Sequence, residues 1–222
     1  MSVQIKINGT EHITISEHQG KMTLIPSIST NKKLNEHCMK MSCSPNPDCI
    51  CKYCYADKTM AMYPKLDASL TNNTEVLTKR ELTTSEIQEI ARHFLNIAIA
   101  RFESFGDLNN ETQLLNYIRI ARAAKHTRFA LFTKRYEIVR KYFESGRRFP
   151  DNVTLVLSSP FIDHVLHESI VDVFKKYHRR VITFTVTSDK ANPSINCGKR
   201  RCVECRNCYD ARNPKNVIEY IK

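Results

Sequence analysis

The feature that most constrains the fold is an alternation of strand-like and helix-like segments over residues 101–186. Short runs rich in β-branched and aromatic residues are typical of strands, and longer segments between them have apolar residues at helical spacing. Such strands are joined by right-handed crossovers and form a parallel sheet. The sequence therefore predicts an α/β fold, either a partial (β/α) barrel or an open parallel sheet of about 5–6 strands. The expected strands are 101–105, 128–132, 153–158 and 181–186, and the expected helices are 111–125, 136–145 and 165–177.

Three local signals precede this alternation. Residues 3–7 alternate apolar and polar up to an Asn-Gly pair at residues 8–9, and the alternation resumes afterwards, which predicts a β-hairpin. A further strand is expected within residues 22–28. Thr83, followed three residues later by Glu86, predicts a capping box at the start of an amphipathic helix.

Residues 31–57 are polar, contain prolines and carry five cysteines, which predicts a loop without regular secondary structure. In a parallel α/β sheet the ligand site lies at the carboxyl ends of the strands. The residues that directly follow the expected strands are therefore candidates for a site: Gly106, Asp107, Thr133, Lys134, 158–160 and 187–189.

All nine cysteines fall into two short clusters, with none between them. Thiols spaced a few residues apart are typical of a metal centre, whereas disulfide frameworks spread their cysteines through a small secreted domain. The N-terminal segment lacks the pattern of a signal peptide, and the longest apolar run is too short to span a bilayer. We therefore expect a cytoplasmic protein that makes no membrane contact and keeps its cysteines reduced.

The C-terminal cluster consists of Cys197, Cys202, Cys205 and Cys208. Its CxxCxxC run suits the corners of an iron-sulfur cluster, whereas zinc sites usually combine two separated CxxC pairs. An iron-sulfur centre is favoured, and zinc is the alternative. This centre would be an electron relay, a substrate ligand or a structural clasp for the C-terminal segment.

The N-terminal cluster allows two arrangements. If Cys43, Cys51 and Cys54 are the ligands, a four-iron cluster keeps one iron without a thiolate, where a small molecule can bind. If Cys38 or Cys49 completes the set, the centre is closed and serves structure or electron transfer. The sequence favours the open arrangement.

The string CKYCYA at residues 51–56 resembles the core of the radical S-adenosylmethionine (radical SAM) motif. The segment RFESFGDL at residues 101–108 is similar to the site where that superfamily usually has a Gly-Gly-Glu stretch. Together with FALFTKR at 129–135 and the C-terminal cysteines, these segments resemble an uncharacterised phage-associated family of small radical-SAM-like proteins. The resemblance covers residues 25–208.

This resemblance implies a 4Fe-4S cluster bound by the N-terminal cysteines and S-adenosylmethionine bound beside it. Tyr53 would lie beside the adenine, and Ser104, Gly106 and Asp107 would contact the methionine part. The implied reaction reduces the sulfonium by one electron, supplied by an electron donor, and gives a 5'-deoxyadenosyl radical that attacks an unknown substrate. Cys43 and Cys51 are separated by seven residues, where the superfamily usually has three.

The composition supports a second hypothesis. Lys and Arg number 34 against 23 acidic residues, a formal charge of +11, which favours anionic partners such as nucleic acid. The alternative function is thus a non-catalytic basic protein, stabilised by zinc or iron-sulfur centres, that binds nucleic acid through residues such as Lys199, Arg200, Arg201, Arg206 and Arg212.

We expect one α/β domain over residues 1–190, with the cysteine loop at 38–54, and a C-terminal extension over 191–222 that packs on it.

Overall fold

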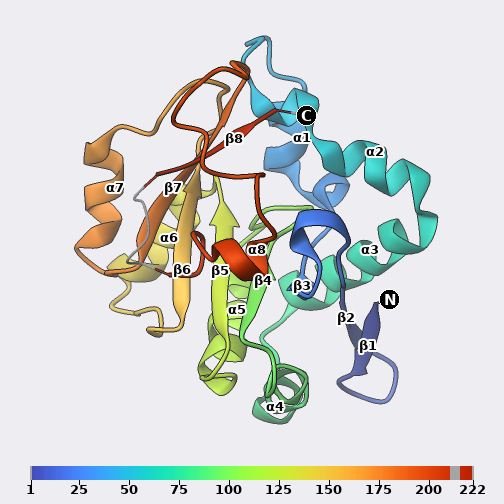
Figure 1. Cartoon of the computed structure of the whole chain (residues 1–222). Coiled ribbons are helices and arrows are strands. Elements are labelled where there is room, and N and C mark those ends of the chain that lie inside the picture. Colours follow the sequence, from blue (N-terminus) through green and yellow to red (C-terminus); the bar gives the residue numbers. More distant parts are fainter. Residues whose placement is uncertain (1, 211–215, 222) are drawn as a thin grey trace.

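The computed structural model describes residues 2–210 and 216–221 and has an α/β fold with an N-terminal hairpin and a six-stranded parallel sheet (Figure 1). The strands of the sheet stand in chain order, β3-β4-β5-β6-β7-β8. The strands are β1 (Val3–Lys6), β2 (His12–Ile15), β3 (Ser27–Ile28), β4 (Ile99–Phe102), β5 (Arg128–Thr133), β6 (Val153–Ser158), β7 (Val181–Thr187) and β8 (Asn216–Tyr220). The antiparallel hairpin joins β1 and β2.

The helices lie mostly in the connections between the strands of the sheet. The α-helices are α1 (Glu36–Ser42), α2 (Tyr55–Met62), α3 (Pro64–Lys79), α4 (Thr84–Arg92), α5 (Glu111–Ala123), α6 (Tyr136–Glu144), α7 (Glu168–Lys175) and α8 (Cys202–Cys205). Short 3-10 helices are η1 (Gly20–Met22), η2 (Lys32–Leu34) and η3 (Ile50–Tyr53). None of the helices in the described part of the chain is long and apolar enough to cross a bilayer.

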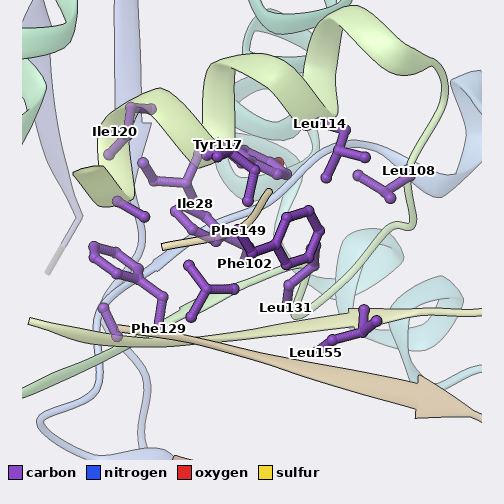
Figure 2. Close-up of a cluster of buried hydrophobic side chains, with 14 of the residues drawn as sticks. Ile28, Phe102, Leu108, Leu114, Tyr117, Ile120, Phe129, Leu131, Phe149 and Leu155 are labelled. Carbon is purple, nitrogen blue, oxygen red and sulfur yellow. The ribbon is translucent and has the colours of Figure 1, made fainter. Parts of the chain in front are cut away.

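Helices α3 to α7 cover one face of the sheet and form the main core with it. Figure 2 shows part of this core, with Tyr117 of α5 above Phe102 of β4. The Phe102 ring stacks on both Tyr117 and Phe129, with ring centroids 4.4 and 4.6 Å apart. Parallel strands joined in chain order by crossovers of one hand place all of these helices on the same face.

The C-terminal cysteine segment covers the opposite face of the sheet. Ile99, Phe132, Val156 and Ile182 point to this face, and Tyr209 and three of the four cysteines of this segment pack against them. The described part of the connection between β7 and β8 thus runs on the face that the helices leave open (Figure 1).

The structure confirms the predicted fold class, the N-terminal hairpin and the capping box at Thr83. The prediction that residues 31–57 lack regular structure is wrong, because Asn35 caps a two-turn helix, α1, within them. The strand expected at 101–105 is also displaced, since β4 ends at Phe102 and Glu103 has a φ of 61°, which ends the extended backbone. Arg212 lies outside the described residues.

The core predicts a contrast between two identical substitutions. Leu131 of β5 is fully buried, whereas Leu95 is 61% exposed. Leu131→Ala is expected to lower the free energy of unfolding by about 2–5 kcal/mol because it leaves a cavity. Leu95→Ala should change it by no more than about 0.5 kcal/mol. Urea unfolding of both variants checks this, and equal losses would contradict the assignment of the core.

Candidate metal centres

The N-terminal cysteine loop lies at the carboxyl edge of the sheet, beside the segment that follows β6. The Ile50 amide donates a hydrogen bond to the Pro160 carbonyl at 3.0 Å. Cys49 also forms an isolated β-bridge with Phe161. The cysteines are therefore held at the edge where parallel α/β sheets bind their ligands.

Asn35, a fully buried side chain, fastens this loop to the segment that follows β4. Its side-chain oxygen accepts from the Cys38 amide at 3.1 Å and caps α1. Its side-chain nitrogen lies 3.0 Å from the Asp107 carbonyl oxygen and 3.2 Å from that of Leu108. One side chain thus joins the first cysteine to the Gly106-Asp107 segment.

Lys32, which is 2% exposed, ties two cysteine-bearing segments together. Its ammonium donates to the Asp57 carboxylate at 2.5 Å and to the Ser42 hydroxyl at 3.1 Å. The Ser42 hydroxyl lies 2.9 Å from the Cys38 carbonyl oxygen and 3.2 Å from the Cys51 carbonyl oxygen. A buried ammonium is costly unless it is paired, so this lysine fixes the loop through its partners.

The thiols of Cys38, Cys51 and Cys54 lie near enough to the Lys134 amine to influence its pKa. Burial alone would lower the pKa of Lys134, yet the Asp107 carboxylate and these three thiols, in their ionised form, raise it above its ordinary value. Burial raises the pKa of the Cys38 thiol, and it raises that of Cys51 to about 11. Buried thiols with a raised pKa stay protonated unless a metal ion binds them as thiolates.

The other two cysteines of the loop have different surroundings. Cys43 ends α1 and is exposed. Cys49 is buried, and its thiol donates to the Met41 carbonyl at 3.2 Å. The structure thus brings two of the three expected ligands, Cys51 and Cys54, together with Cys38.

Asp107 is held from three sides by protein donors. Its carboxylate accepts from the Thr133 hydroxyl at 2.5 Å and from the backbone amides of Leu108 at 2.8 Å and Lys134 at 2.9 Å. It is 2% exposed. The cap of helix α5 comes instead from Asn110. Asp107 therefore links the ends of β4 and β5.

Glu103 is a buried carboxyl group directly after β4, and it accepts four hydrogen bonds. They come from the Thr30 amide at 3.2 Å, the Thr30 hydroxyl at 3.1 Å, the Gln113 side chain at 2.6 Å and the Tyr117 hydroxyl at 2.5 Å. Burial raises the pKa of Glu103 to about 7, although these hydrogen bonds oppose the shift. The donors also hold the residue in its left-handed backbone conformation.

Gly106 packs where no side chain fits. A Cβ atom at this position would lie 2.6 Å from the Thr30 carbonyl oxygen and 2.9 Å from a Glu103 carboxylate oxygen. The segment after β4 can therefore approach the segment after β3 this closely only with glycine here.

Two further predicted site residues border this edge. The Ser104 hydroxyl is buried and has no hydrogen-bond partner among the described residues, although the Ser104 carbonyl accepts from the Tyr55 hydroxyl. Tyr53 lies in η3 and is 57% exposed. A buried hydroxyl without a hydrogen-bond partner is unfavourable unless a ligand or a water molecule supplies the missing hydrogen bond.

The four C-terminal cysteines share one cavity on the open face of the sheet. A volume of about 30 Å³ is lined by Cys197, Cys202, Cys205 and Cys208. Burial, with smaller contributions from the other three sulfurs, raises the pKa of the Cys208 thiol to about 12. All four thiols are thus close enough to act on one another.

Two cations lie beside these sulfurs. The Lys21 ammonium is 3.7 Å from the Cys197 sulfur and pairs with the Glu219 carboxylate. The Arg101 guanidinium lies 3.6 Å from the Phe132 ring centroid, and its charge partly offsets the effect of burial on the pKa of Cys208. The charge of Arg101 also acts on the pKa of Tyr55, the residue that follows Cys54.

Both donor sets fit iron-sulfur clusters in their chemistry, because these clusters are bound by cysteine thiolates. The first set offers three thiols near one half-buried cation, and the second offers four thiols around one cavity. In the described ranges, 2–210 and 216–221, no three His, Cys, Asp or Glu side chains stand in an arrangement that would hold a single metal ion.

A family model described as Gene product 88 matches residues 6–217. The chain belongs to the gene product 88 family. No curated protein and no solved structure gives a match to the chain. The family assignment covers both cysteine clusters and the whole parallel sheet except the last residues of β8.

Sequence reasoning missed several residues that build this edge: Thr30, Lys32, Asn35, Glu103, Gln113 and Tyr117. Glu103 was placed inside an expected strand, and its position directly after β4 became visible only in the structure. Lys134 was identified by its position after a strand, but no sequence signal placed it among the cysteines.

Gly106 predicts a second pair of matched variants. Gly106→Ala is expected to lower the free energy of unfolding by about 1–3 kcal/mol because the new methyl group meets the Thr30 carbonyl oxygen and the buried side chains of Thr30 and Glu103. Gly9→Ala is the control, since no atom lies within 4 Å of a Cβ there. Thermal unfolding measures both, and an unchanged midpoint for Gly106→Ala would refute the close approach.

The raised pKa of Glu103 predicts a pH dependence. Between the ordinary pKa of about 4.3 and the folded value of about 7, the folded protein binds more protons at this group than the unfolded chain does. This contribution to stability is therefore fully present below pH 4 and is lost as the pH rises to about 7. Urea unfolding at several pH values should show a slope that Glu103→Gln lacks; an identical slope in the variant would contradict it.

Proposed function

We propose that this protein is an iron-sulfur protein with a radical SAM-like core, in which Cys38, Cys51 and Cys54 hold a 4Fe-4S cluster. The observation that carries the proposal is the link between the two cysteine-bearing segments at the carboxyl edge, where the Ser42 hydroxyl lies 2.9 Å from the Cys38 carbonyl oxygen and 3.2 Å from that of Cys51. The charges of Cys38, Cys51 and Cys54 also act on the nearby Lys134 amine. Cys38 replaces Cys43, the ligand expected from the sequence, because Cys43 is exposed and Cys38 is buried beside Asn35.

The chain's own groups prepare this site for a negatively charged cluster. The Lys134 ammonium offsets thiolate charge, and Asp107 fixes the backbone amide of Lys134 at 2.9 Å. The buried side chains of Asn35 and Lys32 position the loop before any ligand binds. Charges fixed in a dry site act more strongly than the same charges in water.

Three thiolates leave one iron of a four-iron cluster without a protein ligand. The chemistry that such a cluster supplies when bound is the one-electron reduction of a sulfonium ligand such as S-adenosylmethionine. The Ser104 hydroxyl, buried and without a partner among the described residues, is available to bind the ligand's polar groups. Gly106 and Asp107 are occupied by protein contacts, so they support the site and contact ligand less directly than the resemblance implies.

The four C-terminal cysteines hold a second cluster in this proposal. Their common cavity and the flanking Lys21 and Arg101 cations suit four thiolates. In this proposal the second cluster is an electron relay for the first. Zinc at this position would instead make it a structural clasp.

The test is metal analysis of anaerobically purified protein and its cysteine variants. Two four-iron clusters give about eight iron and about eight sulfide per chain. Cys38→Ser should lower both to about four, whereas Cys43→Ser, the matched control, should leave both unchanged. Loss of iron in Cys43→Ser with none in Cys38→Ser would refute the ligand assignment. Colourless protein loaded with zinc would refute the iron-sulfur proposal.

A separate experiment tests whether the N-terminal cluster binds and cleaves S-adenosylmethionine. Addition of S-adenosylmethionine to the reduced protein should change the electron paramagnetic resonance spectrum of the N-terminal cluster and yield 5'-deoxyadenosine. Neither change should occur in Cys38→Ser. An unchanged spectrum in the native protein would limit the function to electron transfer or structure.

A further inference from the structure

The positive charge of the chain is concentrated at the amino edge of the sheet, opposite the N-terminal cysteine loop. The connections 122–128, 145–152 and 175–180 lead into β5, β6 and β7, or end the helices before them. These 21 residues contain nine Lys or Arg and one acidic residue, which accounts for +8 of the formal +11. Charge spread evenly over the surface would put only about a tenth of the excess here.

The centre of this edge is hollow. A depression of about 340 Å³ is lined by residues that include Arg122, Lys125, His126 and Arg128, with Asp151 on its other side. Arg122, Lys125 and Arg128 are exposed. The volume falls within the range of sites that bind ligands of some size.

Asn152 makes the floor of the depression rigid. Its side-chain nitrogen lies 2.8 Å from the Ala121 and Thr127 carbonyl oxygens and 3.2 Å from that of Ala124. The Thr127 hydroxyl donates in turn to the Phe94 carbonyl at 2.7 Å. The loop that carries Lys125 is thus held in place before any partner binds.

The next loop adds two arginines at fixed positions. The Arg147 guanidinium lies 5.7 Å from the Tyr142 ring centroid, and that of Arg148 lies 5.2 Å from the Tyr177 ring centroid. The Arg122 guanidinium donates to the Arg148 carbonyl at 2.5 Å, which joins the two loops. Cation–π contacts hold guanidinium groups at low entropic cost while their edges stay free to bind.

Acidic groups neutralise only part of this surface. Asp151 pairs with Arg179 at 2.9 Å, Asp172 pairs with Lys175 at 3.0 Å, and Asp210 lies 3.8 Å from Arg128. Lys125, Arg147 and Lys176 are exposed cations outside these pairs. They belong to three connections that lie side by side, because β5, β6 and β7 are neighbours in the sheet.

We propose that this amino edge binds the phosphodiester backbone of a nucleic acid. Neighbouring strands are about 4.8 Å apart, so cations in three successive connections extend over about 10 Å or more. A row of this length matches a polymer of phosphates better than a single phosphate. Arginine, which supplies six of the nine cations, binds phosphate oxygens in a bidentate way. The surface does not depend on the proposed iron-sulfur function, since strands of six residues separate it by about 20 Å from the cysteine loop.

The test compares two triple variants of equal charge change in a fluorescence-anisotropy assay. The first carries Lys125→Gln, Arg147→Gln and Lys176→Gln at the amino edge. The control carries Lys40→Gln, Lys58→Gln and Lys65→Gln, three exposed lysines on α1, α2 and α3. The probes are a labelled DNA duplex, a single-stranded RNA and vesicles that contain anionic lipid, and circular dichroism verifies that both variants fold.

The native protein should bind nucleic acid with an affinity that falls about 100-fold between about 50 and about 200 mM salt, as expected for about four phosphate contacts. The edge variant should reduce the slope of log affinity against log salt by roughly 3, and the control should keep the native slope. Equal losses in both variants, absence of nucleic-acid binding, or binding to vesicles alone would each overturn the proposal. Iron content, measured on the same samples, reports on the iron-sulfur proposal separately.

Discussion

The structure depends on the need of a parallel sheet to be covered on both faces. Because the strands follow one another in chain order, helices α3 to α7 all lie on one face. Ile99, Phe132, Val156 and Ile182 point to the other face of the sheet. The C-terminal cysteine segment, which has little regular structure, covers them. Cysteine sulfurs and Tyr209 supply much of that cover, so in this account the C-terminal cysteines stabilise the fold as well as bind metal.

The second requirement is the attachment of a polar, cysteine-rich loop to the carboxyl edge. Buried polar groups are stable only when hydrogen-bonded, and this edge satisfies several of them with one another. Asn35 joins α1 to the segment after β4, Lys32 joins α1 to η3 through Ser42, and Glu103 joins β3 to α5. The loop that carries the cysteines is therefore a preorganised part of the fold. Preorganisation is what a reactive metal centre requires of its protein.

Periodicity in the sequence was enough to predict the sheet where the packing is purely apolar. Strands β5, β6 and β7 are buried runs of β-branched and aromatic residues, and α4 has an apolar stripe with a clear cap. Helix α3 gave no such signal because part of its buried face is polar. Its Asn73 side chain is 1% exposed and bonds the Thr14 backbone on both sides. Strand β8 was not foreseen either, since its half-buried residues pair with β7 only after a long connection.

The sequence predicted where in the sheet the candidate site lies, but it did not predict which side chains contact one another there. The rule that ligands bind at the carboxyl ends of strands identified Asp107, Thr133 and Lys134, which the structure brings together. The sequence analysis took Cys43 as the third ligand of the open arrangement, whereas burial and the Asn35 contact favour Cys38. Which of the two cysteines faces the site depends on a loop conformation that residues distant in sequence stabilise. The spacing of the cysteines in the sequence does not predict that conformation.

The most direct test of the account is anomalous X-ray scattering at the iron edge from crystals grown without oxygen. The account predicts two separate iron peaks, one contacted by the Cys38, Cys51 and Cys54 sulfurs with the Lys134 ammonium nearby, and one among the four C-terminal cysteines. An iron peak bound by Cys43 with Cys38 unligated, or a zinc signal with no iron at either position, would contradict it.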